Sequence, residues 1–163
     1  GFYFFNVSPA KIFLGNSGSY LLGFLISIFY FDSYINSYIS IDVLLIIHAV
    51  FIIDTLYTLI IRFLNHLLFV TDSIKHDFIM RITKSLIYIT HPHNTHAYQK
   101  ICMANSSHFK TSFQILLYNL FWLLPISILC SDYIEYSFIF ILCAFLPYII
   151  LCIYFRAGRQ NLD

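Results

Sequence analysis

The stretch Ser8–Ser19 has residue types that suit the binding of a phosphate group at the start of an apolar helix. It combines a cation, Lys11, with Gly15 and Gly18, which let a backbone approach a ligand closely. The first amides of a helix lack partners inside it, and the helix dipole attracts anions to them. The pattern therefore predicts a phosphate site, although the same residues also suit a turn and cap ahead of a membrane-spanning helix.

The densest polar cluster is the run His91–Gln99, which reads His-Pro-His-Asn-Thr-His-Ala-Tyr-Gln. Neutral imidazole is a common ligand of transition metals, so the three histidines allow a metal site. No cysteine or carboxylate lies close by in the sequence to complete such a site, and a surface loop with incidental histidines is a second interpretation. The run is a candidate ligand site for which both interpretations stay open.

Asp54, Thr58 and Arg62 lie four residues apart and share one face of a helix. A carboxylate at membrane depth is costly and usually faces a partner or a water-filled cavity. The three side chains therefore predict either part of a functional site or a buried polar network without chemistry of its own. Asp54 at depth also allows a small transporter subunit, but no second feature of the sequence supports that class.

The composition of the chain is strongly apolar, and it indicates what kind of helices hold these residues. The 163-residue chain is 60% hydrophobic, 20% aromatic and only 10% charged, with a mean hydropathy of +0.78. Soluble domains carry about 25% charged residues, so this composition predicts a membrane protein. A net charge of +1 without a basic run argues against nucleic acid as a partner. The chain begins at Gly1 rather than at Met, without a signal-peptide pattern, so we expect a piece of a longer protein.

A membrane-spanning helix needs about 20 mostly apolar residues. The sequence predicts an all-α, polytopic fold with four such helices, at residues 12–31, 41–64, 112–130 and 136–155, and a large loop at 65–111. All nine lysines and arginines then fall on one side of the membrane, which the positive-inside rule makes cytoplasmic. Within the loop, apolar residues recur at helical spacing between Phe78 and Ile89. They predict an amphipathic helix that lies on the cytoplasmic leaflet or packs against the other helices.

Two runs of the chain have counterparts in a known family. They read Asn6-Val-Ser-Pro9-Ala-Lys11-Ile-Phe-Leu-Gly15-Asn16-Ser-Gly18-Ser19 and Asp54-Thr-Leu-Tyr-Thr58-Leu-Ile-Ile-Arg62. The first resembles the Asn-x-x-Pro-Ala-(Arg/Lys)-Ile-Phe-Met-Gly-Asp-x-Gly-Ser segment of glycosyltransferase family 4, the polyprenyl-phosphate N-acetylhexosamine-1-phosphate transferases. The second is similar to that family's Asp-x-x-x-Thr-Leu-x-x-Arg run.

The histidine run also has a counterpart, because His93-x-x-His96-Ala-Tyr98-Gln99 resembles the cytoplasmic His-Arg-x-His-Ala-Tyr-Gln motif of the O-antigen-initiating branch. Further matches to that branch follow in order, at Ser107-His108-Phe-Lys110-Thr111, at Asn119-Leu-Phe-Trp122-Leu-Leu-Pro125 and at Ala157-Gly158-Arg159. The resemblance covers nearly the whole chain. It implies the C-terminal half of a transferase whose N-terminal half lies outside this sequence.

The resemblance implies roles for individual residues. The implied catalytic residues are Asn16, His93 and His96, and the implied substrate contacts are Asn6, Lys11, Gly15, Gly18, Ser19 and Asn94. It also implies Mg²⁺, whose ligand in the family is an aspartate at the position of Asn16. An asparagine offers one neutral oxygen, so magnesium binding should weaken. Asn94 replaces the motif's arginine, and the long interval between Arg62 and His93 indicates an inserted amphipathic segment.

The activity that the resemblance implies is transfer of a HexNAc-1-phosphate from a UDP-N-acetylhexosamine to undecaprenyl phosphate, with release of UMP. This reaction starts a lipid-linked glycan of the cell envelope, such as the O-antigen of lipopolysaccharide. The implied location is the bacterial inner membrane, with the site facing the cytoplasm. The alternative is a degenerate, non-catalytic membrane fragment of such an enzyme, for which Asn16, Asn94 and the absent half argue. On either interpretation we expect the chain alone to be inactive.

Overall fold

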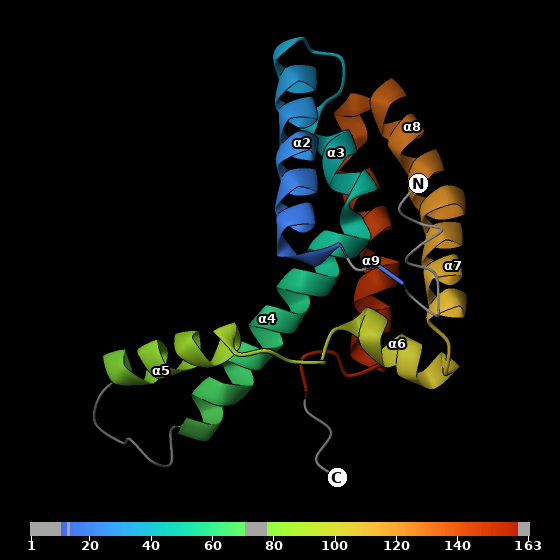
Figure 1. Cartoon of the computed structure of the whole chain (residues 1–163). Helices are drawn as coiled ribbons and strands as arrows, with labels where there is room; N and C mark the ends of the chain where they lie inside the picture. The colour runs from blue at the N-terminus through green and yellow to red at the C-terminus, as the bar shows by residue number, and fades with distance from the viewer. Residues whose placement is uncertain (1–10, 13, 71–77, 160–163) are drawn as a thin grey trace. The chain divides into compact units, whose positions relative to one another are not determined.

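The structure, a computed structural model, describes residues 11, 12, 14–70 and 78–159. Every regular element within these residues is helical (Figure 1). The elements are α2 (Gly15–Ile35), α3 (Ile41–Ile47), α4 (Ala49–Val70), α5 (Phe78–Thr90), α6 (Ala97–Asn105), α7 (His108–Tyr118), a π-helical turn (Asn119–Leu123), α8 (Leu124–Asp132), a 3₁₀ turn (Ile134–Tyr136) and α9 (Ser137–Tyr154). Four stretches are long and apolar enough to cross a membrane, namely Gly15–Ile35, Ala49–Leu68, His108–Asp132 and Ile134–Tyr154. The predicted all-α membrane fold with four spanning helices is therefore confirmed.

The segment predicted as one span at 41–64 is divided at His48 into two helices, α3 and α4. The backbone of His48 leaves the helical conformation, with φ −96° and ψ 10°. Its ring nitrogen Nδ1 lies 3.2 Å from the carbonyl oxygen of Leu44, and the ring also meets the hydroxyl of Tyr30 on α2. The apolar stretch that is long enough to span therefore begins at Ala49.

The other predicted bounds differ from the observed ones by a few residues. The first helix begins at Gly15 and continues to Ile35, and the third and fourth apolar stretches are each longer than predicted at their N-terminal end. The predicted loop at 65–111 contains the end of α4, the whole of α5 and α6 and the start of α7. The helix predicted between Phe78 and Ile89 is confirmed as α5.

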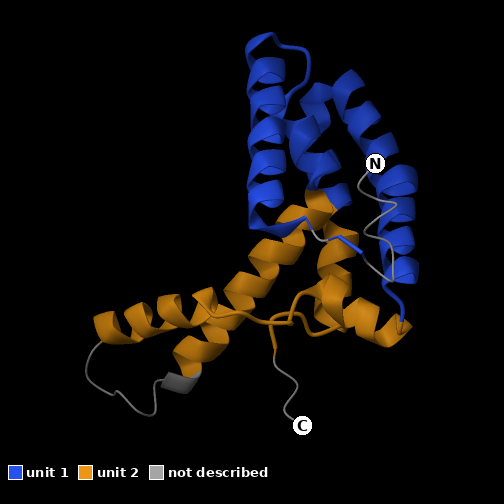
Figure 2. Ribbon diagram, viewed as in Figure 1, with its two compact units in different colours: residues 1–48, 107–144 blue, residues 49–106, 145–163 orange. Residues whose placement is uncertain are grey.

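The described helices divide into two compact units, residues 1–48 with 107–144 and residues 49–106 with 145–163 (Figure 2). In the first unit, α3 packs against α8 and the π-helical turn. Ser40 caps α3, because its hydroxyl oxygen accepts a hydrogen bond from the amide of Val43 at 3.4 Å. Ile46 of α3 and Leu123 of the π turn are almost fully buried and form the apolar centre of this unit.

Two prolines, Pro125 and Pro147, lie in the spanning helices. Pro147 lies inside α9 and has no N–H, so the carbonyl of Cys143 one turn earlier loses its usual partner. The indole N–H of Trp122 donates to that carbonyl at 3.2 Å. An unpaired carbonyl is costly in lipid, so this bond supports the proline-containing helix. The π turn Asn119–Leu123 ends two residues before Pro125, and π turns and prolines are both common sites of helix kinks.

Candidate functional site

Helix α4 carries a polar stripe that is buried in the second unit. Asp54, Thr58 and Arg62 are exposed by only 6%, 0% and 3%. The predicted shared face is thus confirmed, whereas the apolar side chains of Leu56 and Ile60 are exposed. The helix directs its charged groups toward the segments packed on it and its apolar groups away from them.

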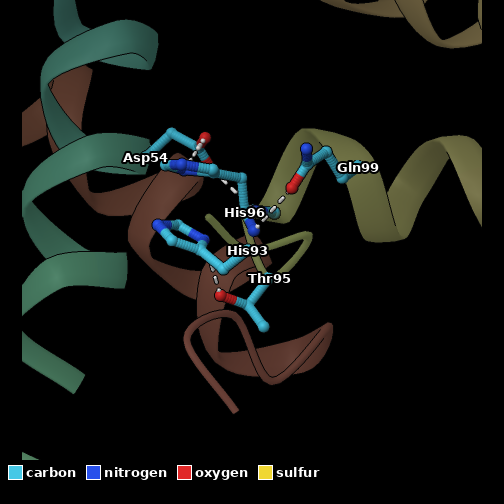
Figure 3. Close-up of polar contacts among 6 residues, drawn as sticks. Asp54, His93, Thr95, His96 and Gln99 are labelled. Carbon is cyan, nitrogen blue, oxygen red and sulfur yellow. Dashed lines mark hydrogen bonds and ion pairs between the residues drawn. The ribbon is translucent and has the colours of Figure 1, made fainter. Parts of the chain in front are cut away.

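The carboxylate of Asp54 fixes the start of α6. The backbone amide of Ala97, the first residue of α6, donates to Oδ1 of Asp54 at 2.7 Å. The amides in the first turn of a helix have no partner inside the helix, and this bond satisfies one of them. The helix dipole also stabilises a negative charge at the N-terminus of α6. The amide of His96 donates to the side-chain oxygen of Gln99 at 3.2 Å. Figure 3 shows these groups gathered between α4 and the beginning of α6.

The second carboxylate oxygen of Asp54 orients the ring of His96. Oδ2 lies 3.0 Å from Nδ1 of the imidazole, and the side chains of Asp54 and His96 are 8% and 22% exposed. An ionised carboxylate only accepts hydrogen bonds, so a hydrogen bond across this contact requires the hydrogen on Nδ1. The other nitrogen, Nε2, is then an acceptor in the neutral ring and a donor in the protonated ring. His96 can therefore exchange a proton or a hydrogen bond with a ligand through a single fixed atom.

His93 lies beside His96, with 4.8 Å between the ring centroids (Figure 3). Its Nδ1 lies 3.1 Å from the hydroxyl of Thr95, which holds the ring from the other side. Burial lowers the pKa of His93 below its usual value, and the electrostatic effects of the nearby Arg62 and His96 side chains lower it further. Because its pKa is lowered, His93 is a neutral imidazole near pH 7.

Arg62 holds the opposite end of the histidine loop. Its guanidinium group donates to the carbonyl oxygens of Ile89 at 3.0 Å, Tyr88 at 3.2 Å and His91 at 3.4 Å. These carbonyls belong to the last turn of α5 and the residue after it, where a helix leaves its acceptors unpaired. Arg62 thus anchors the start of the loop while Asp54 anchors its end, so one face of α4 positions both histidines.

The segment that follows α9, residues 156–159, forms hydrogen bonds with the histidine loop and with α6. The ammonium group of Lys100 on α6 donates to the carbonyl oxygens of Arg156 at 2.9 Å and Arg159 at 2.8 Å. The amide of Gly158 donates to the carbonyl of Thr95 at 2.8 Å. Burial and the charges of the two arginines lower the pKa of Lys100. The tail is therefore part of the structure that fixes the histidine loop.

The glycine-containing segment belongs to the first unit, and Asn6 lies outside the described residues. Lys11 and Asn16 are exposed, and α2 begins at Gly15, whose φ of +65° suits glycine. The hydroxyl of Ser19 donates to the carbonyl of Gly15 at 2.8 Å. Gly18 lies within the first turns of α2, where a Cβ atom would come within 2.8 Å of the Leu14 side chain. Asn94, the remaining predicted contact, is exposed in the histidine loop of the second unit.

Comparison with known proteins supports the family suggested by these motifs. Residues 1–34, which include the glycine-containing segment, match the sequence model of glycosyl transferase family 4. The chain is also 45% identical over 67 residues to a Bacillus subtilis (strain 168) protein named "Probable undecaprenyl-phosphate N-acetylglucosaminyl 1-phosphate transferase". The N-terminal segment of this chain is therefore similar to glycosyl transferase family 4. The matched region is 40% of this chain and 19% of the Bacillus protein, so only a small part of that relative is represented. No solved structure matches the chain.

The residues that the structure describes do not form a magnesium site by themselves. Among the described residues, no three histidine, cysteine or acidic side chains are grouped closely enough to hold a metal ion. Asn16 offers one neutral amide oxygen, whereas Mg²⁺ is usually held by carboxylates and phosphates. The carboxylate of Asp54 is bound to Ala97 and His96. The described donor set therefore does not fit the metal.

Some residues that fix the histidine loop were not predicted from sequence. Thr95 and Lys100 carried no motif signal that distinguished them from other polar loop residues. Gly158 belonged to the matched tail, and a glycine in a short motif is the signal that could have indicated its packing role. The sequence marked both Asp54 and His96 but did not indicate that they contact each other.

Replacing Gly158 by alanine is expected to lower the free energy of unfolding by about 2 kcal/mol. Gly158 has φ +76°, and an added Cβ would lie 2.8 Å from Cβ of Ile61 and 3.0 Å from the backbone oxygen of Thr58. The tail must shift away from α4 to accept the methyl group. The measurement is an SDS titration of the purified chain in mixed micelles, followed by circular dichroism.

Gly23→Ala is the matched control for Gly158→Ala. Gly23 lies inside α2, and no atom lies within 4 Å of its added Cβ. Alanine is the better helix former, so this change should leave stability unchanged or raise it by up to about 1 kcal/mol. Equal stability of the Gly158 and Gly23 variants would show that the tail does not require glycine.

The lowered pKa of His93 predicts that acidification destabilises the folded chain. Between the lowered pKa and the usual value of 6.5, the unfolded chain binds a proton that the folded chain does not. The free energy of unfolding should therefore fall as the pH drops from about 7.5 to about 5.5. His93→Gln keeps a polar partner for Thr95 and removes the titration, so its unfolding should depend less on pH. An unchanged pH dependence in His93→Gln would contradict the assignment.

Proposed function

We propose that the chain forms part of a membrane transferase that moves a sugar-1-phosphate onto a polyprenyl phosphate. The family match and the named activity of the Bacillus relative support this reaction class. The observation that carries the proposal is the histidine pair, which α4 fixes through Asp54 and Arg62. Phosphoryl transfer depends on positioning and on stabilising negative charge more than on covalent help from the protein.

In this proposal the histidine loop binds the phosphates or the base of the donor. When the ring of His96 is protonated, Nε2, which faces away from the carboxylate of Asp54, donates a hydrogen bond to a phosphate oxygen. His93 and the amide of Asn94 add further polar groups within the same short loop. Because both ends of the loop are anchored, little ordering is needed when the ligand binds. In the first unit, Lys11 and the first turn of α2 offer positive potential at the glycine-containing segment.

The finer proposal is that the donor is a UDP-N-acetylhexosamine, the acceptor undecaprenyl phosphate and the by-product UMP. The Bacillus relative is named for an N-acetylglucosaminyl 1-phosphate transfer, which supports this donor. The O-antigen branch is supported by the resemblance of the His93–Gln99 run. On the same grounds we place the protein in the bacterial inner membrane, with the histidine loop at the cytoplasmic face.

The proposal is tested by joining this chain to the part of the Bacillus protein that it lacks. The chain is fused behind the part of the Bacillus protein that precedes the matched region, and membranes are assayed for transfer of radiolabel from UDP-N-acetylglucosamine into lipid. The fusion should transfer label, and His93→Ala or His96→Ala should remove about 99% or more of the activity. His108→Ala, at the exposed first turn of α7, is the control and should retain it. A folded fusion that transfers no label would contradict the proposal.

An inactive fusion would favour the second candidate, a non-catalytic membrane protein derived from such an enzyme. Two substitutions, Asn16 for an acidic residue and Asn94 for a basic one, are the observations that favour it. Both remove charge from positions where the resemblance implies contact with a metal or a phosphate. Restoring them together, by Asn16→Asp and Asn94→Arg, should then produce activity where the unmodified fusion has none.

Magnesium binding is a separate part of the proposal, because Asn16 alone does not make a site. The ion, when bound, would neutralise negative charge on the phosphates. Asn16→Asp is nearly isosteric and adds an anionic oxygen, so it should tighten binding of a divalent ion to the fusion by about tenfold. Titration with Mn²⁺, read from the electron paramagnetic resonance (EPR) signal of the free ion, measures this without an activity assay. Equal affinity in the two proteins would place Asn16 away from the metal.

A further inference from the structure

Two helices of the second unit expose apolar side chains that no described part of the chain covers. On α4, Leu56, Ile60, Leu64 and Leu68 repeat every four residues and are 45–69% exposed. On α5, exposed apolar residues gather away from the side that packs on α4, at Phe78, Ile79, Leu86 and Ile87. Such a surface would be unfavourable in water.

Contacts on the opposite side of α5 join it firmly to the second half of α4. Nδ1 of His66 lies 3.0 Å from the hydroxyl of the buried Ser85, and the guanidinium of Arg81 donates to the carbonyl of Leu67 at 3.3 Å. His66 also stacks on Tyr88, with 4.2 Å between the ring centroids. The two helices therefore form one helical hairpin with a fixed outer surface.

This hairpin extends past the end of the neighbouring spanning helix. Helix α9 ends at Tyr154, and Gly158 then packs against Thr58 and Ile61 of α4. The part of α4 that follows Ile61, together with the whole of α5, thus lies beyond the level at which α9 ends. In Figure 2 both helices belong to the unit that also contains this end of α9.

The apolar stripe of α4 does not stop at that level. It runs from Leu56 through Ile60 and Leu64 to Leu68, all within the stretch Ala49–Leu68 that is long and apolar enough to cross a membrane. Acyl chains that cover the stripe at Leu56 can therefore also cover it at Leu68. Lys84, an exposed cation of α5, lies outside the apolar arc and can extend toward headgroups.

We propose that the α4–α5 hairpin lies in the interfacial region of one leaflet, with Leu64, Leu68, Ile79 and Leu86 in contact with acyl chains. This assigns the outer face of α5 to lipid rather than to water or to another protein. Because Arg62 and its carbonyl partners belong to the same hairpin, the depth of the hairpin also sets the depth of the histidine loop. The proposal stands independently of the transferase activity.

The experiment uses single spin labels on the full chain in lipid nanodiscs, with the exposed Cys143 replaced by alanine. Labels are placed by Leu64→Cys, Ile79→Cys and Leu86→Cys, and EPR measures their collision rates with oxygen and with a water-soluble nickel complex. Oxygen concentrates in acyl chains, so its collision rate should exceed that of nickel severalfold at these three positions. Lys84→Cys is the matched control on the same helix and should be more accessible to nickel than Leu86→Cys.

Either of two other outcomes would overturn the proposal. High accessibility to nickel at Ile79→Cys and Leu86→Cys would show that the outer face of α5 meets water. Low accessibility to both reagents would show that another protein or a second copy of the chain covers it. Circular dichroism of each labelled variant checks that the helices remain formed, and Ile79 and Leu86 are exposed enough for a label to leave the packing of α5 unchanged.

Discussion

Replacing Arg62 by methionine is expected to destabilise the second unit by about 4 kcal/mol, because it removes the donors of a buried group that serves three carbonyls. The guanidinium is 3% exposed and donates to Tyr88, Ile89 and His91. Methionine has a similar length and fills the space, so the loss comes from hydrogen bonds rather than from a cavity. The unpaired carbonyls at the end of α5 should weaken its attachment to α4. An SDS titration followed by circular dichroism measures the loss.

Lys84→Met is the matched control for this substitution. It also replaces a cation by methionine in the α4–α5 hairpin, but Lys84 is exposed. Its expected effect is within about 0.5 kcal/mol. If the Arg62 and Lys84 variants unfold at the same detergent concentration, Arg62 does not anchor the loop. Arg62→Lys should fall between the two, since an ammonium group cannot reach three carbonyls in the fixed geometry of a guanidinium.

The spanning helices could be predicted from sequence because long apolar runs have few alternatives in a membrane. The division of the second span at His48 could not, since it depends on a contact with Tyr30 on another helix. The amphipathic pattern of α5 predicted a helix at the correct place. The pattern left open whether that helix packs on the protein or lies on lipid, and the structure shows that one face packs on α4.

The sequence indicated several individual residues of the site but not the contacts between them. Asp54 and His96 each stood out, one by its depth and the other by its motif. They are 42 positions apart in the sequence, and a sequence pattern with helical period does not connect residues across an intervening helix. The hydrogen bonds formed by Lys100 and Gly158 depend on backbone carbonyls and amides, which every residue possesses. Backbone contacts of this kind leave no side-chain signal.

Replacing Asp54 by asparagine is expected to reverse the hydrogen position on His96 while leaving α6 in place. The amide oxygen of asparagine can still accept the hydrogen bond from Ala97, which the carboxylate receives at 2.7 Å. In the unmodified chain, Nδ1 of His96 lies 3.0 Å from a carboxylate oxygen of Asp54. In the variant, the NH₂ group of the asparagine takes the place of that oxygen, and an NH₂ group and an Nδ1–H group, both donors, cannot form a hydrogen bond with each other. The ring should shift its hydrogen to Nε2, so that Nδ1 accepts from the amide. Asp54→Ala instead removes both bonds and should cost about 3 kcal/mol in stability.

Nitrogen-15 magnetic resonance of histidine-labelled chain distinguishes the two tautomers, and His96→Gln identifies the resonances of His96. The unmodified chain should show hydrogen on Nδ1 and Asp54→Asn should show it on Nε2, with stabilities within about 1 kcal/mol of each other. Asp132→Asn, at the exposed end of α8, is the control and should leave the histidine spectrum unchanged. In the active fusion the same exchange should lower the transfer rate by about 10²- to 10⁴-fold, because a neutral asparagine no longer stabilises the positively charged ring that donates to a phosphate. An unchanged tautomer in Asp54→Asn would show that Asp54 holds α6 but does not orient His96.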